Sequence, residues 1–174
     1  MVAEYVRRAA SGDVDAITAL ASDQRSRYAR YQPVYWRPAA NAEDVRRPYL
    51  AQLVSNDDVL ALVSDDDGTV AGLLIATFGD AQTVYDPGGR TCTIDDFVVA
   101  PGRWATTGAK LLRAAISDAA ARGAIQAVVV TANLDEPKRE ALRCCGLSIA
   151  SEWWVTSWPP PAADADATQP ESRH

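Results

Sequence analysis

Two adjacent carboxylates, Asp95 and Asp96, lie in an apolar stretch that continues through a turn into a second apolar segment (IDDFVVAPGRWATTGAKLL, residues 94–112). A carboxylate can accept a proton from a reacting group, and it attracts a cation beforehand. Successive residues of a regular strand point to opposite faces, so the two side chains share a site only if a bulge interrupts the strand. The alternative is that both are solvated charges of an edge or a turn.

The turn that follows these carboxylates has the composition of an anion site. It is rich in small residues and leads directly into an amphipathic helix predicted over residues 104–122. The first N–H groups of a helix have no partner within it, and the helix dipole is positive at that end, so both favour a phosphate. The alternative is an ordinary helix start whose small residues serve packing.

Other kinds of chemistry are excluded by residue type. The only histidine is His174, the last residue, so a Ser–His–Asp or Cys–His site is not expected. Cys144 and Cys145 lack the paired spacing of a zinc site, and we predict no metal. Both are expected to be small, buried, apolar residues of the core.

The composition describes a globular protein of 174 residues, 48% hydrophobic and 23% charged, with a net charge of −6. The negative charge argues against nucleic acid and anionic membranes as partners. No apolar run is long enough to span a membrane, and the first residues do not resemble a secretory signal. Three cysteines do not make a disulfide framework, so a cytoplasmic location is expected.

These residues must be positioned by an α/β fold in the order β-α-α-β-β-β-α-β-α-β. The predicted strands cover residues 4–9, 58–64, 69–78, 90–99, 124–131 and 146–156, and the helices begin near residues 13, 41, 104 and 135. Asp67-Gly68 indicates a hairpin turn. The apolar strand 124–131 is expected to be buried on both faces. We predict one domain over residues 1–158 and a disordered tail over 159–174.

The order of elements, together with RTCTIDDFVVAPGRW (residues 90–104), resembles the GNAT superfamily of acyl-CoA-dependent N-acyltransferases, and in particular its diamine acetyltransferases. The resemblance implies a mixed, splayed sheet and acetyl-CoA as co-substrate. It implies that Asp95 performs acid–base work and that Asp96 is associated with the amine. The expected acceptor is a primary amine of a small molecule.

The resemblance also implies a cofactor site. The family pattern R/Q-x-x-G-x-G/A fits two registers, starting at Trp104 or at Arg103, and both lack its first glycine. The family's asparagine falls on Asp135, with Asn133 nearby, and its proton-donating tyrosine falls on Leu142. For Asp135 a helix N-cap is the alternative. The expected cofactor residues are Val98, Val99, Arg103, Trp104, Thr106, Thr107, Gly108, Ala109, Asn133 and Asp135.

The acceptor side is expected in the aromatic segment RYARYQPVYWRP (residues 27–38), which holds Tyr28, Tyr31, Tyr35 and Trp36. Aromatic faces attract cations, although packing over a core edge is the alternative. The tryptophans near residue 154 indicate packing or a homodimer surface. Two rivals stay open: a non-catalytic acyl-CoA-binding or regulatory module on the same fold, and a peptide N-terminus as acceptor.

Overall fold

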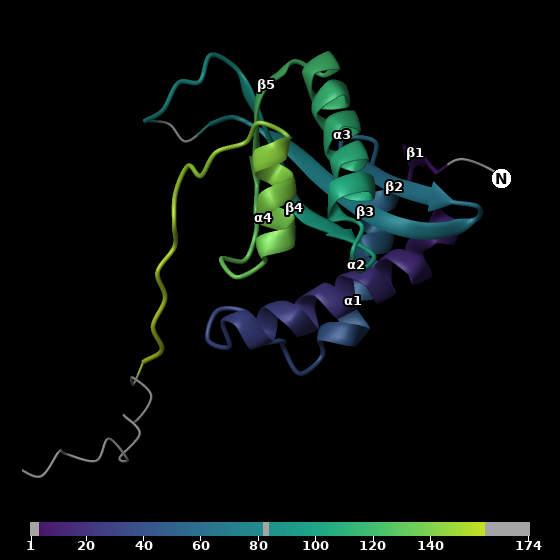
Figure 1. The fold of residues 1–174 in the computed structure, drawn as a ribbon, viewed down its shortest axis with the longest axis vertical. Helices are drawn as coiled ribbons and strands as arrows, with labels where there is room; N and C mark the ends of the chain where they lie inside the picture. Colours follow the sequence, from purple (N-terminus) through teal and green to yellow (C-terminus); the bar gives the residue numbers. More distant parts are fainter. Residues whose placement is uncertain (1–3, 82–83, 159–174) are drawn as a thin grey trace, which may run out of the picture.

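The structure, a computed structural model, describes residues 4–81 and 84–158 (Figure 1). The predicted tail therefore lies outside the described residues. One sheet has the strand order β1-β2-β3-β4-β5. Neighbouring strands are antiparallel except for the parallel pair β4 and β5. The strands are β1 (Tyr5–Arg8), β2 (Leu60–Asp66), β3 (Thr69–Gly79), β4 (Arg90–Val99) and β5 (Ala124–Val129).

Helices cover both faces of this sheet, which confirms the predicted fold class (Figure 1). One face packs against α1 (Val14–Tyr31) and α2 (Ala42–Ser55), and the other against α3 (Ala109–Ala121) and α4 (Glu136–Cys144). Alternate strand residues feed the two cores, as a period of two requires: Val63 faces α1 and α2, whereas Leu62 faces α3. Among the described residues, no helix has the length and apolarity to cross a membrane.

The hairpin between β2 and β3 turns where the sequence predicts. Asp67 and Gly68 have φ values of 54° and 81°. Positive φ at both central residues matches the right-handed twist of the flanking strands, which explains the Asp-Gly pair. This hairpin fixes the register of β3, against which β4 is laid.

A bulge interrupts β4 at the carboxylate pair. Ile75 of β3 pairs with Asp96, but the next residue, Ala76, pairs with Ile94, so Asp95 has no partner across the ladder. Ile94 consequently lies in the core beneath α3, and Asp96 opposes Ile75 on the other face. The interruption that a shared site would need is present.

Beyond the bulge, β4 and β5 separate. Their pairing extends from Arg90 to Ile94, and the last bond joins the N–H of Val130 to the carbonyl of Ile94 at 3.0 Å. Within the described residues, the rest of β4, which ends at Val99, has no ladder partner on this side. The fold therefore contains an opening between two parallel strands, with α4 beside it (Figure 1).

Three predictions about the C-terminal part were wrong. The described residues 147–158 form no strand, so β5 is an edge strand. Its apolar side chains are not buried on both faces, because no further strand covers them: Ile125 is 51% exposed. Cys144 is also exposed and Cys145 only half-buried, since both lie in the last turn of α4 or just after it.

Candidate active site

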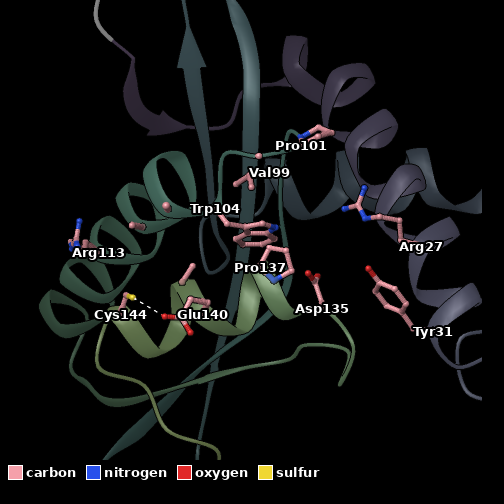
Figure 2. A pocket seen from close by; sticks show the side chains of 14 residues that line it. Arg27, Tyr31, Val99, Pro101, Trp104, Arg113, Asp135, Pro137, Glu140 and Cys144 are labelled. Atoms are coloured by element: carbon pink, nitrogen blue, oxygen red, sulfur yellow. Dashed lines mark hydrogen bonds between the residues drawn. The ribbon is translucent and has the colours of Figure 1, made fainter.

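A cleft of about 570 Å³ opens between α1, the turn before α3, and α4 (Figure 2). Five of the residues predicted for the site line it: Tyr31, Val99, Trp104, Ala109 and Asp135. Trp104 lies near its middle, under Pro137 of α4 (Figure 2). The ring of Trp104 packs edge-on against Phe97 at 4.9 Å, which joins the cleft wall to the core.

Two arginines that the sequence analysis missed lie at opposite ends of the cleft, Arg27 on α1 and Arg113 on α3 (Figure 2). Neither has a hydrogen-bond or ion-pair partner within the described residues, although most other arginines there are paired. Arg113 follows Ala109 by one helical turn, and this spacing alone places it on the same face as the predicted turn. Two unpaired cations across a cleft suit an anionic ligand.

The turn before α3 winds as a π-helical segment, Trp104–Gly108. The N–H of Gly108 donates to the carbonyl of Arg103 at 3.0 Å. Within the described residues, the N–H groups of Trp104 and Ala105 have no backbone acceptor. Donors without partners at the positive end of a helix form an anion-binding nest, here at the edge of the cleft.

Four other residues predicted for this turn do not line the cleft. Arg103 pairs with Asp66 at 2.6 Å, and the hydroxyl of Thr106 lies 3.5 Å from a carbonyl of its own turn. Gly108 lies against Trp104, whose ring would be 2.7 Å from an added Cβ. Close packing of that ring therefore requires the glycine.

Thr107, the fourth, is fully buried, and its hydroxyl donates to the carboxylate of Glu4. Desolvation would raise the pKa of Glu4, but hydrogen bonds from Lys110, Thr107 and Ser64 outweigh it and lower that pKa to about 2. Glu4 thus ties the N-terminus of α3 to β2. Thr107 is directed toward this anchor rather than toward the cleft.

The carboxylate pair divides into two environments. Asp96 forms an ion pair with Arg46 of α2. Asp95 has no hydrogen bond or ion pair within the described part of the chain. Its pKa is raised by desolvation and by Asp96, against an opposing effect of Lys138. A carboxylate with a raised pKa and a free oxygen can accept a proton.

A buried polar network joins α1, β4 and α4 behind the cleft. Gln24 donates to the hydroxyl of Tyr28 at 3.2 Å and to the carbonyl of Phe97 at 2.9 Å. Tyr28 donates to Asp135 at 3.0 Å, and Asp135 accepts the N–H of Lys138 as the predicted N-cap of α4. Tyr28 is therefore held within the network.

The ammonium of Lys138 completes this network, and no pattern in the sequence indicates it. A lysine one turn into a helix is normally a surface residue. Here its side chain is fully buried and donates to the carbonyls of Phe97 at 3.1 Å and Val130 at 2.8 Å. These two carbonyls can accept hydrogen bonds from Lys138 only because β4 and β5 do not pair with each other at this point.

The remaining predicted residues lie around the site. Tyr31 reaches the cleft, whereas Trp36 packs on Tyr28 and Tyr35 with ring centroids 5.0 and 4.7 Å apart. Asn133 is exposed and accepts a bond from Arg139. Val98 faces the core beneath α1 and α2, and Leu142 is buried in the core beneath α3.

The chain was compared with known proteins. The model of the acetyltransferase (GNAT) family matches residues 19–147, a range that includes the bulge, the turn and the cleft. A comparison with the curated protein sequences finds no match.

Several solved structures share the fold at low sequence identity. A mutant of the BH1408 protein from Bacillus halodurans has a TM-score of 0.75 at 15% identity, covering 88% of this chain and 98% of that one. A predicted acetyltransferase with acetyl-CoA from Clostridium acetobutylicum has a TM-score of 0.68 at 15% identity, covering 89% and 96%. An aminoglycoside antibiotic 6′-N-acetyltransferase from Acinetobacter haemolyticus has a TM-score of 0.65 at 14% identity, covering 88% and 97%.

Proposed function

Because the chain belongs to the acetyltransferase (GNAT) family, we propose that it transfers an acetyl group from acetyl-CoA directly to a primary amine of a small molecule. The observation that carries the proposal is the cleft between α1, the turn before α3, and α4. It combines two unpaired arginines with unpartnered N–H groups, and it lies beside the opening between β4 and β5.

The cleft provides for the phosphates of acetyl-CoA. Arg27 and Arg113 neutralise their charge, and the N–H groups of Trp104 and Ala105 donate to the pyrophosphate. The backbone of Val98 and Val99, which has no ladder partner on the β5 side, pairs with the pantetheine arm as an added strand would. Acetyl-CoA supplies the thioester whose carbonyl carbon the amine attacks.

Asp95 takes the proton that the amine must lose. The bulge places its carboxylate at the point where the two strands separate, and no protein donor within the described residues occupies it. Its raised pKa brings it closer to neutrality, where a general base is more effective. Asp96 is held by Arg46, so we assign it the lesser role of fixing α2 beside the acceptor.

The acceptor class is proposed from the net charge of the chain and from a relative in fold. A relative in fold acetylates an aminoglycoside, a polycationic amine, and this chain carries a net charge of −6. Both favour a cationic small molecule. In this proposal, the aromatic residues near the acceptor are Tyr31, Tyr35 and Trp36. The cytoplasmic location and the homodimer stay predictions.

A second candidate function is a non-catalytic acyl-CoA-binding module. Leu142 favours it, because a buried leucine occupies the place of the proton-donating tyrosine. The two candidates share the cofactor and differ in whether thiol is released from acetyl-CoA when an amine is added.

The first test is calorimetric titration with acetyl-CoA, CoA and dephospho-CoA. We expect micromolar binding that weakens without the 3′-phosphate. Arg27→Ala and Arg113→Ala should each weaken it by about 10- to 100-fold, the equivalent of one hydrogen bond to a charged group. Arg30→Ala is the matched control, since Arg30 is an exposed arginine of α1 outside the cleft. Absence of binding at millimolar acetyl-CoA would overturn the proposal.

A further inference from the structure

We propose that Lys138, on the buried side of α4, gives the leaving CoA thiolate its proton, in place of the tyrosine whose position Leu142 occupies. The inference rests on the proposed function and deepens it. It assigns a chemical step to a buried cation whose position on α4 would otherwise indicate a surface lysine.

The position of the ammonium is the first argument. The pairing of β4 with β5 ends at Ile94, whose carbonyl accepts the N–H of Val130. Directly beyond this point, Nζ of Lys138 bridges the carbonyls of Phe97 on β4 and Val130 after β5. The ammonium thus lies at the apex of the opening, where the acyl end of a cofactor lying between the strands must arrive.

The unused donor is the second argument. An ammonium has three N–H groups, and the two carbonyls accept two of them. The third has no oxygen acceptor within the residues that the structure describes, and the rings of Phe97 and Trp104 lie 5.3 and 5.7 Å from Nζ. Because Trp104 also lines the cleft, this ring lies between the ammonium and the cleft, to which Lys138 itself does not contribute a wall.

The charges around the ammonium suit proton transfer to sulfur. Burial lowers the pKa of Lys138 to about 8, while Asp135 at the start of α4 and Asp96 and Asp95 on β4 raise it. On the α1 side, Tyr28 has a pKa raised to about 12 by burial and by Asp135, so it keeps its proton. A thiol resembling cysteine has a pKa of about 8.5, so the transfer is nearly balanced.

The proposed step conserves atoms and electrons. The neutral amine nitrogen bonds to the acetyl carbon, and the carbon–sulfur bond breaks with its electron pair remaining on sulfur. Nζ gives one proton to this thiolate, leaving free thiol and a neutral lysine. Asp95 takes the proton that the acylated nitrogen loses, and solvent returns it to Lys138. The products are the N-acetylated amine and CoA.

A purely structural role of Lys138 would also explain its bridge between two strands. The variants must therefore separate a structural role from proton donation. Lys138→Met keeps the length of the side chain and removes the charge. It leaves the carbonyls of Phe97 and Val130 without this donor, so urea unfolding of the variant accompanies its kinetics. Lys138→Arg keeps the charge and the donors, but a guanidinium does not release its proton near neutral pH. A structural bridge tolerates arginine, whereas a proton donor does not.

The test measures acetyl transfer from acetyl-CoA to putrescine, kanamycin and tryptamine, together with CoA binding, on both sides of the pKa of about 8. The wild-type kcat should fall as pH rises through this value, because the donor must be protonated. Both variants should be slower by about 100-fold, the low end for general acid catalysis, since a thiolate leaves readily. In Lys138→Met the alkaline fall should disappear, with CoA affinity unchanged.

Two results would overturn the inference alone: an alkaline fall that persists in Lys138→Met, or wild-type rates in Lys138→Arg. Absence of CoA binding and of transfer in the wild type would remove the proposed function and the inference together. A second measurement does not need a folded variant. The chain has only two lysines, Lys110 and Lys138, so NMR of nitrogen-labelled lysine resolves both. One signal should titrate near pH 8 and respond to CoA; two ordinary, unresponsive lysines would contradict the inference.

Discussion

Two cations, the half-buried Arg7 and the buried Lys138, show how one fold uses charge in opposite ways. Arg7 of β1 donates four hydrogen bonds of 2.7 to 3.0 Å to the carboxylates of Asp13 and Asp65. Arg7, Asp13 and Asp65 thus form one cluster of ion pairs. It fixes the start of α1 to the first two strands. Among the residues that the structure describes, the ammonium of Lys138 on α4 donates to two neutral carbonyls alone.

The pKa values follow from this difference. Hydrogen bonds from Arg7 lower the pKa of Asp13, and the carboxylates of Asp13 and Asp65 raise the pKa of Arg7. Asp13 and Arg7 therefore stay charged over the ordinary pH range. Burial instead lowers the pKa of Lys138, and desolvation raises that of Asp95, so both move toward neutrality. Complete pairing favours a permanent structural contact, and incomplete pairing favours proton exchange.

The largest effect is expected from Asp95→Ala, which acts on the incompletely paired side. Acetyl transfer should fall by about 10²- to 10⁴-fold, the contribution of a general base, while CoA affinity and stability stay the same. Steady-state kinetics measures the rate, calorimetry the CoA affinity, and urea unfolding the stability. The control is Asp15→Ala, because Asp15 lies in an exposed ion pair. An unchanged rate would contradict the role of Asp95, and an inactive wild type that binds acetyl-CoA would favour the non-catalytic module.

Arg7→Met should lower the stability of the protein and leave its CoA affinity unchanged. It leaves two carboxylates without their cation, and we expect the free energy of unfolding to fall by about 2–3 kcal/mol, less than for a fully buried pair. Urea unfolding measures this loss. Arg47→Met removes an exposed pair and should change little. A large loss of CoA affinity in the folded Arg7 variant would erase the distinction between the two regions.

The smallest effect is a pH dependence of stability. The lowered pKa values of Asp13 and Glu4 contribute stability that is fully present above their unfolded values, 3.8 and 4.5. For Glu4 this stability is lost as pH falls toward about 2. Urea unfolding from neutral to acid pH should show the loss, and Arg7→Met should remove the part that belongs to Asp13. A flat profile in the wild type would show that these carboxylates are not stabilised on folding.

The candidate site was only partly predictable. Asp95 was predicted from its neighbours in the sequence, because the strand, the carboxylate and the following turn are local, and its role stays a prediction. Arg27 and Arg113 lie 86 positions apart and meet at one cleft only through packing of α1 and α3 on opposite faces of the sheet. Thr107 shows the reverse: its position in the turn was predicted, but its hydroxyl is bonded to Glu4, which is distant in sequence.

The fold was predictable wherever one element fixes its own pattern. The range 90–99 of β4 and the Asp-Gly hairpin follow from periodicity and turn chemistry. The final strand did not form, because alternation of apolar residues over 146–156 shows that a segment can be a strand but not that a partner is within reach. Trp154 is 91% exposed as a result.

The sequence by itself determined the types and order of the elements as far as α4, the absence of an internal histidine, and the carboxylate at the point where the pairing of β4 with β5 ends. These depend on residues close together in the chain, whose interactions do not require a particular packing of the other elements. Only the tertiary structure decided which carboxylate is paired, which arginines stay unpaired, and that Lys138 is buried. Each of these depends on desolvation and on partners from other elements, and neither is encoded in local spacing.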